Sequence, residues 1–361
     1  MRGVSLGHRG VVQHTSGVNV LFELLNRGKK SLAVDLNSLQ GQEIVRKLAT
    51  QVDILVTNLM PHRQDRYRLN YEDVSKANAR IIYVALTGYG PEGPDRDRSG
   101  FDYAAFWARS GIMGSLGEAG SLPIQQRPGM GDQVTSLAMT AAIALGLYER
   151  EQSGVGQRID CSLLNTGLWA IGGDVMAALQ SGRAPDHICR SEVGNPLFNY
   201  YQCADGKWVQ LVMIESERFW DGFCRAVGLH QIVADPMFAS HASRSQNNRE
   251  LIRILDDLFL TKPRPEWAKA LDSENCIWAP VQTLDEVVDD PQLNANNYTD
   301  TLNHPEGGEF RILNTPMQFS RTPAKIRGLA PELGEQGDQI LLDLGYSWDD
   351  IISMKENNTV R

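Results

Sequence analysis

The stretch from Arg127 to Gly167 constrains the fold most strongly, because it joins a glycine-bracketed turn, a long apolar segment and a strand-like segment. Asp132 stands at the end of the turn, where the apolar segment begins. From Val134 to Tyr148 the residues are apolar on nearly all sides of a 3.6-residue period, which predicts a helix buried within the protein. The sequence therefore places a carboxylate at the start of a buried helix.

Two interpretations of Asp132 fit this pattern. An aspartate between a glycine turn and a helix is a preferred N-cap, since its side-chain oxygen accepts an unpaired backbone N–H of the first turn. Alternatively, the glycines let a substrate approach the backbone closely, while the helix N-terminus keeps the aspartate ionised as a nucleophile or proton acceptor. Residue types and spacing leave both interpretations open.

The first third of the chain alternates between strand and helix patterns, which is typical of a parallel α/β sheet. We expect strands at residues 31–36, 53–59 and 80–86, with helices at 38–51 and 71–79. No GxGxxG sequence follows any of these strands, which disfavours a dinucleotide site. Open parallel sheets bind ligands beyond the carboxyl ends of their strands. A ligand site is therefore expected after the second and third strands.

A chain of 361 residues exceeds one typical hydrophobic core, so two domains are expected. Composition changes at a Gly- and Pro-bearing connector, residues 182–196, and a hairpin pattern with a four-residue turn follows at 199–214. Four helical patterns come next. We therefore predict a large α/β domain formed by residues 1–185 and 322–361, and a smaller α+β domain over 186–321.

Charge and cysteine usage exclude several classes of protein. A net charge of −9 argues against nucleic acid as the main partner. The longest apolar run, residues 137–148, is too short to cross a bilayer, so no membrane association is expected. The five cysteines include no CxxC pair and the histidines show no ligand spacing, which predicts no metal site and a reducing, cytoplasmic location.

Several short segments occur in an order that resembles the class III CoA-transferases. This family contains formyl-CoA and carnitine CoA-transferases, and alpha-methylacyl-CoA racemase is related to it. The segments, in chain order, are NRGKKSLAVDL, VDILVTNLMP, RIIYVALTGYGPEGP, GFD, GMGD, SGVGQRIDCSLL and PELGEQ. The resemblance covers nearly the whole chain. It implies a Rossmann-like large domain with an inserted smaller domain, an interlocked homodimer, and Asp132 of GMGD as the nucleophile.

The resemblance also implies a CoA pocket at the strand ends, where guanidinium groups suit the CoA phosphates. CoA and acyl-CoA enter as substrates, and no permanently bound cofactor is expected. The implied pocket residues are Leu36, Asn58, Leu59, Met60, Arg66, Arg98, Gly100, Phe101, Asp102 and Tyr103.

The implied reaction moves CoA from an acyl-CoA thioester to a carboxylic acid through an aspartyl-CoA intermediate. A racemase is the first alternative, but those relatives carry a proton-accepting His where this chain has Phe101. A second alternative is a non-catalytic, shortened CoA-binding relative, because the first strand, helix and second strand of the family have no counterpart at the front of this sequence. Gln336 also stands where the family usually has His.

Overall fold

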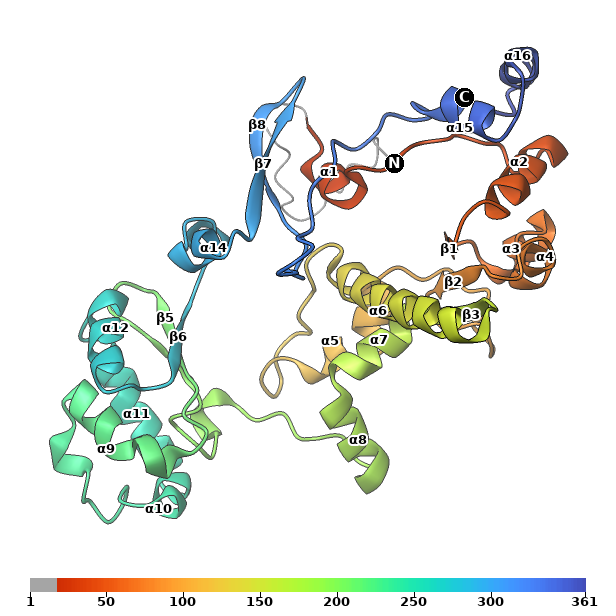
Figure 1. Ribbon diagram of the computed structural model, residues 1–361. Helices are drawn as coiled ribbons and strands as arrows, with labels where there is room; N and C mark the ends of the chain where they lie inside the picture. Colours follow the sequence, from red (N-terminus) through yellow and green to blue (C-terminus); the bar gives the residue numbers. More distant parts are fainter. Residues whose placement is uncertain (1–17) are drawn as a thin grey trace. The chain divides into compact units, whose positions relative to one another are not determined.

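The structure is a computed structural model that describes residues 18–361 (Figure 1). The chain forms two compact units. The first consists of the described part of Met1–Gly114 together with Gln125–Leu179 and Gln292–Arg361. The second consists of Ser115–Ile124 and Gln180–Pro291. The predicted small domain, 186–321, overlaps the second unit, but residues 292–321 belong to the first.

A three-stranded parallel sheet lies at the centre of the first unit, in the order β1-β2-β3. Its strands are β1 (Ile54–Thr57), β2 (Ile82–Thr87) and β3 (Gln157–Ser162). The parallel register aligns Thr57 with Ala85 and Thr87 with Ser162. The carboxyl ends of all three strands therefore meet at one edge. The alternation of strand and helix patterns predicted β1 and β2, and the strand-like segment after the apolar helix is β3.

Helices cover both faces of this sheet (Figure 1). Side chains of a strand alternate between faces. Tyr83 and Ala85 of β2 accordingly pack in a cluster with residues of α2 (Leu39–Ala49) and α4 (Tyr71–Ala77). Ile82 and Val84 pack in another cluster with residues of α6 (Met130–Ser153). The central strand is thus buried on both sides, which explains its continuous apolar sequence.

The strand expected at residues 31–36 is not part of the sheet, so that prediction was wrong. Only Val34 forms a bridge, and its partner is Val360 at the other end of the chain. The backbone N–H of Asp35 donates to Thr359 O at 2.9 Å, and that of Arg361 donates to Ala33 O at 3.1 Å. The apolar residues of the segment join a cluster with α2 and the two C-terminal helices.

Residues 292–321 join the first unit through the hairpin of β7 (Thr299–His304) and β8 (Gly308–Leu313), which was not predicted. This hairpin contacts α1 (Val20–Asn26). The guanidinium of Arg27, just after α1, donates a hydrogen bond to the carbonyl of Leu313. This contact gives the physical reason that the hairpin groups with the first unit.

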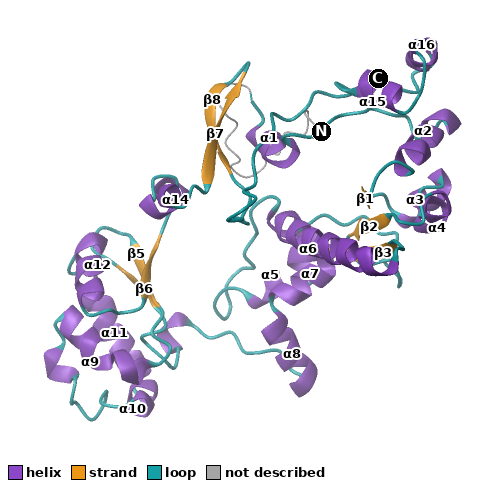
Figure 2. Cartoon of the chain, in the orientation of Figure 1, coloured by secondary structure: helices purple, strands orange, loops and turns teal. Residues whose placement is uncertain are grey.

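The second unit is an α+β structure with its own core (Figure 2). The predicted hairpin is present as β4 (Tyr200–Gln202) and β5 (Trp208–Leu211), and β6 (Trp278–Val281) pairs antiparallel with β5. Helices α9 (Ser216–Val227) and α11 (Asn248–Phe259) each bury one apolar face in this core.

The remaining elements are short. The segment η1 (Tyr103–Ala108) is a π-helical turn, a form that is rare and usually occurs as a single turn. The other elements are α3 (Pro61–Tyr67), α5 (Ile112–Ser115), α7 (Leu163–Ala170), α8 (Gly172–Ser181), η2 (Arg190–Glu192), η3 (His230–Ile232), α10 (His241–Gln246), α12 (Arg264–Ser273), α13 (Leu284–Val287), α14 (Pro291–Ala295), α15 (Gly337–Asp343) and α16 (Trp348–Glu356).

The long helix α6 differs from its prediction in one respect. The helix is present, but it is not buried on all sides within the described chain. Leu145 and Tyr148 are 70% and 69% exposed, and Leu137 is 43% exposed. Only one stripe, which includes Gly131, Thr135 and Met139, faces the unit's own interior. Apolar composition alone did not reveal that the rest of the surface faces away from this chain. No helix among residues 18–361 is both long and apolar enough to cross a membrane.

Candidate active site at the carboxyl edge of the parallel sheet

Helix α6 runs antiparallel to the strands, and this direction places Asp132. Near its C-terminal end, the Arg150 guanidinium donates to the carbonyls of Asp53 and Arg80 at 3.4 and 3.1 Å. Both carbonyls precede a strand, so the helix ends beside the amino edge of the sheet. A helix of 24 residues is about 36 Å long, whereas a strand of six residues spans about 20 Å. The start of α6 therefore reaches the carboxyl edge.

The loop between β2 and η1 is closed at its base by two glycines. A Cβ on Gly88 or on Gly100 would lie 2.8 Å from the Cα of the other, so neither position accepts a side chain without a shift of the backbone. The N–H of Leu164 donates to Gly88 O at 3.0 Å, which ties this base to the end of β3. Because Gly88 and Gly100 lie this close together, Asp102, two residues after Gly100, lies near the carboxyl edge of the parallel sheet.

The start of α6 is packed tightly against η1. A Cβ on Gly131 would lie 2.5 to 2.7 Å from three atoms of the Phe106 side chain, which is buried. The N-cap of the helix is Gly129, whose φ of +75° suits glycine. Asp132 is the third residue of the helix and not its cap. The N-cap interpretation of Asp132 is therefore wrong.

The Asp132 carboxylate has no hydrogen bond or ion pair in the described part of the chain. The surrounding protein removes water from it, and the charge of Asp102 repels its own, so both raise the pKa of Asp132. The helix N-terminus acts in the opposite direction, because its dipole favours a negative charge. The result is a poorly solvated carboxylate with free lone pairs, which is a suitable nucleophile.

Asp102 has a structural role that its sequence did not reveal. Its side chain is only 4% exposed, and Oδ1 accepts a hydrogen bond from the N–H of Tyr103 at 2.8 Å. The second oxygen, Oδ2, is buried without a hydrogen-bond partner in the described chain. Unpaired buried polar atoms are rare and costly, and they concentrate at functional sites. Asp102 therefore couples the η1 turn to the electrostatics of Asp132.

The predicted residues Asn58, Leu59 and Met60 directly follow β1 at the same edge. The N–H of Leu59 donates to Thr57 Oγ1 at 3.1 Å, and Met60 is the N-cap residue of α3. The Gln64 amide donates to Leu59 O at 2.6 Å, which fixes the turn. The side chain of Asn58 remains exposed.

The two predicted arginines are both exposed but have different neighbours. Arg66 lies in the last turn of α3, 3.5 Å from the Oδ1 of Asn37. Arg98 lies 3.4 Å from Asp95 and stacks near the ring of Tyr89. Arg98 is therefore partly neutralised, whereas Arg66 has no carboxylate partner among residues 18–361.

Sequence reasoning missed Arg109 and Asp95. The Arg109 guanidinium lies 5.0 Å from the Tyr89 ring centroid and forms an ion pair with Asp95. This hydrogen bond is the main reason that the pKa of Asp95 is lowered. The stack of Arg98 and Arg109 on Tyr89 adds positive charge to the loop. Arg109 follows η1, whose π-helical form has no recognisable sequence pattern, so no signal pointed to it.

The other predicted positions are less closely tied to the edge. Leu36 is half-buried, and its carbonyl accepts from the Gln42 amide at 3.0 Å. Phe101 is 78% exposed and does not pack in the core of the described chain. Tyr103, half-buried, begins η1. Gln336 stands at the N-cap position of α15 without a side-chain cap, and its Oε1 accepts from the N–H of Ser31 at 2.8 Å, which gives this residue a structural role.

No group of three His, Cys, Asp or Glu side chains within the described ranges is arranged to hold a metal ion. All five cysteines are free thiols.

Known CoA-transferases resemble this chain over most of its length. CoA-transferase family III matches residues 6–337. The (R)-2-hydroxy-4-methylpentanoate CoA-transferase of Clostridioides difficile is 29% identical over 95% of this chain and 86% of its own length. The cinnamoyl-CoA:phenyllactate CoA-transferase of Clostridium sporogenes is 28% identical over 95% and 84%. A CAIB/BAIF family protein from Brucella suis shares the fold with a TM-score of 0.77 at 26% identity, over 90% of this chain and 83% of that one. The chain belongs to CoA-transferase family III.

Proposed function

We propose that Asp132 is the nucleophile of this CoA-transferase. The observation that carries the proposal is the unpartnered Asp132 carboxylate at the start of α6, held there by the contact between Gly131 and Phe106. A carboxylate divides thioester exchange into easier steps, because each step exchanges one acyl bond for another of similar reactivity.

The proposed sequence of steps balances at each stage. An Asp132 oxygen attacks the thioester carbonyl, which gives a mixed anhydride and expels CoA thiolate. The thiolate attacks the aspartyl carbonyl, which forms the aspartyl-CoA thioester and releases the donor as a carboxylate. The acceptor carboxylate then attacks this thioester and expels the thiolate again. Attack of the thiolate on the acceptor carbonyl yields the new acyl-CoA and restores the Asp132 carboxylate.

Backbone N–H groups are available to stabilise the oxyanions of these steps. The first helical hydrogen bond of α6 runs from Gln133 N to Gly129 O at 2.9 Å. The N–H groups of Gly131 and Asp132 precede it and have no partner within the helix. Donors of this kind contribute about 3 kcal/mol each to the stability of an oxyanion. We assign the CoA nucleotide to the edge after β1 and β2, with Arg66 and Arg98 toward its phosphates.

The nucleophile is tested by trapping. The protein is incubated with an acyl-CoA, digested, and analysed by mass spectrometry for a CoA adduct on the peptide that contains Asp132. Hydroxylamine should convert that adduct to a hydroxamate. Asp132→Ala should lose both the adduct and transfer, while Asp349→Ala, at an exposed carboxylate in the first turn of α16, should keep both. Full transfer by Asp132→Ala would refute the proposal.

The donor and acceptor are best sought among the acids in the names of the two relatives. We propose that 2-hydroxy-4-methylpentanoate and phenyllactate are the first acceptors to assay, with cinnamoyl-CoA as a first donor. Each pair is followed by mass detection of the product thioester. Solvent deuterium exchange at the α carbon of the acyl group, measured alongside, should be absent, because Phe101 carries no proton-accepting group.

We also propose that the chain acts as a homodimer in the cytoplasm. Helices α6, α7 and α8 present an apolar surface to solvent: Trp169 is 86% exposed, and α8 has no buried residue. Monomeric proteins rarely expose apolar surface on this scale. A second copy is the partner that a family of interlocked dimers implies. Five free cysteines fit a reducing compartment.

A further inference from the structure

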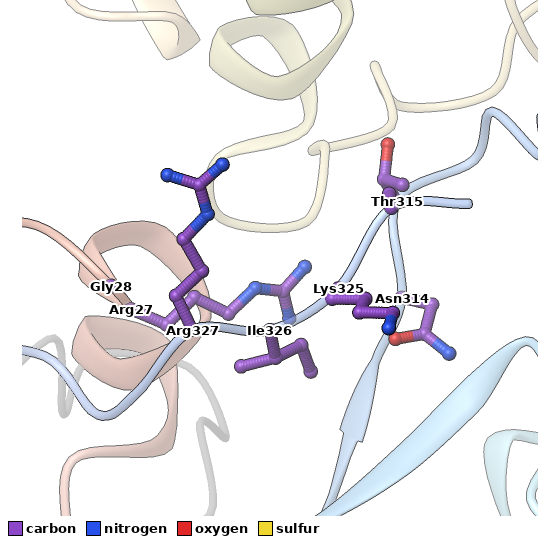
Figure 3. A pocket seen from close by; sticks show the side chains of 8 residues that line it. Arg27, Gly28, Asn314, Thr315, Lys325, Ile326 and Arg327 are labelled. Carbon is purple, nitrogen blue, oxygen red and sulfur yellow. The ribbon is translucent and has the colours of Figure 1, made fainter. Parts of the chain in front are cut away.

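A cavity of about 200 Å³ lies at the C-terminal end of α1, where the chain after β8 passes beside it (Figure 3). Arg27 and Gly28 line it from one side. Asn314, Thr315, Lys325 and Arg327 line it from the segments that follow β8. None of its lining residues is acidic. It contains no residue of the proposed CoA pocket.

Three cationic side chains therefore share one small cavity. Figure 3 shows the Arg27 guanidinium directed toward Lys325 and Asn314. The Arg327 side chain, which also lines the cavity, points in a different direction from that of Arg27. Neither Lys325 nor Arg327 has an ion pair within residues 18–361. Arg27 donates only to the backbone carbonyl of Leu313 among the described residues. Cations that share a cavity repel one another, and a bound anion offsets this repulsion by attracting each of them.

The acidic residue of α1 is engaged elsewhere. Glu23, one turn before Arg27, is buried and accepts from the N–H of Ala330 at 2.9 Å. Its other oxygen lies 3.9 Å from His304 Nε2. Residues 1–17 contain neither Asp nor Glu. An anion that entered the cavity would therefore meet cations for which no acidic lining residue competes.

The backbone around the cavity is fixed by hydrogen bonds. Gly28 has a φ of +69°, and its N–H donates to Leu329 O at 3.1 Å. A Cβ on Gly28 would lie 3.4 Å from the Cβ of Arg327, so the end of α1 and the 327 backbone are held close. On the other side, both the backbone and the amide nitrogen of Asn314 donate at 2.9 Å to residues 297 and 298. These backbone contacts hold the segments that carry the three cations on either side of the cavity.

We propose that this cavity binds a phosphate-bearing anion, with Arg27, Lys325 and Arg327 as its cationic donors. Guanidinium groups pair bidentately with phosphate oxygens, and a lysine ammonium adds a point charge. Three cations match the charge of a phosphate or diphosphate group better than that of a single carboxylate. The hydroxyl of Thr315 supplies a further donor. The phosphate group belongs either to CoA or to a free phosphate compound, and both have the same recognition chemistry.

The test measures binding of inorganic diphosphate to the full chain by calorimetry at low ionic strength. Lys325→Gln/Arg327→Gln should weaken binding at least about tenfold. The matched control is Arg321→Gln/Lys269→Gln, which removes two exposed cations outside the cavity and gives the same net charge. The control should bind within about twofold of the unmodified protein. Thermal melting verifies folding, and Lys325→Gln alone, which leaves Arg327 beside Gly28, should show an intermediate loss.

A repeat with saturating CoA identifies the source of the phosphate. Competition between CoA and diphosphate would assign the cavity to the phosphates of CoA, whereas independent binding would assign it to a separate phosphate compound. Both results retain the proposed anion site. Absence of diphosphate binding, or equal weakening in the cavity variant and the control, would overturn it. This result does not depend on transfer activity, so it is independent of the test of Asp132.

Discussion

Replacing Gly131 by alanine should misplace Asp132 without changing any charge. The new Cβ would lie 2.5 to 2.7 Å from Phe106, whereas carbon atoms in contact are normally about 3.5–4.0 Å apart. Phe106 is 2% exposed, and the nearest atoms include its Cβ and Cγ, which a rotation of the ring does not move away. The start of α6 must therefore move by about 1 Å, the difference between these distances. A displacement of about 1 Å at reacting groups lowers rates by about 100-fold.

The expected stability change is smaller than the loss of rate. Overpacking a core costs about 1–3 kcal/mol, and alanine offsets about 0.5–1 kcal/mol of this through its better helix propensity. Gly131→Ala should therefore unfold at lower denaturant concentration, with kcat about 100-fold below that of the unmodified protein. Steady-state transfer kinetics and urea unfolding, measured on the same preparation, check both values.

Two controls separate displacement from general destabilisation. Gly222→Ala, in the middle of α9, adds a Cβ whose nearest neighbour is 3.5 Å away, so it should be neutral or slightly stabilising. Gly129→Ala has open space, but its φ of +75° costs a residue with a Cβ about 1–2 kcal/mol. It should lose stability with a much smaller loss of kcat than Gly131→Ala. Equal losses of kcat in both variants would refute the argument from the Phe106 contact.

Three further results are expected. Asp102→Asn removes the charge that helps raise the pKa of Asp132, so the acid limb of the pH–kcat profile should move to lower pH. Asp132→Asn should abolish transfer yet raise the free energy of unfolding at neutral pH, measured by urea unfolding. Because the folded-state pKa of Asp132 is raised, ionisation of this carboxyl destabilises the folded protein once the pH rises through that pKa, and asparagine removes this cost. The stability difference between the variant and the unmodified protein should therefore vanish in acid, where Asp132 is protonated in both states. Leu145→Glu should lower the mass measured by light scattering from dimer to monomer, whereas unchanged mass would exclude α6 from the interface.

The sequence predicted the parallel sheet well because its signals are local. The strands at β1 and β2 follow apolar runs, and α2 begins at a Ser38 cap whose side chain accepts from the N–H of Gly41. The segment 31–36 has the same apolar composition, but its partner Val360 is more than three hundred residues away. Periodicity describes one segment and does not identify its partner, so this segment was assigned to the wrong neighbour.

Asp132 was identified by the order of the motifs, whereas its surroundings required the structure. Residues 102, 106 and 131 are distant in sequence and come together through packing around the loop that the Gly88–Gly100 contact closes. Neither a short motif nor a helical pattern predicts a contact between residues this far apart in the sequence. The arginines at 98 and 109 share the Tyr89 ring for the same reason. Resemblance therefore pointed to Asp132 as the proposed nucleophile, and the physical cause of its raised pKa came from non-local packing.

The helix α6 shows how an incorrect prediction carries information. Its apolar sequence predicted burial on all sides, yet Leu145 and Tyr148 are largely exposed within this chain. Burial of a leucine or aromatic side chain stabilises a protein by about 1.5–3 kcal/mol, and a monomer with the apolar face of α6 exposed does not gain this stabilisation. The sequence pattern and the exposed face agree if a second molecule covers α6. Because Asp132 lies in the first turn of α6, that partner would also lie along the element that positions the proposed nucleophile, which would link assembly to catalysis.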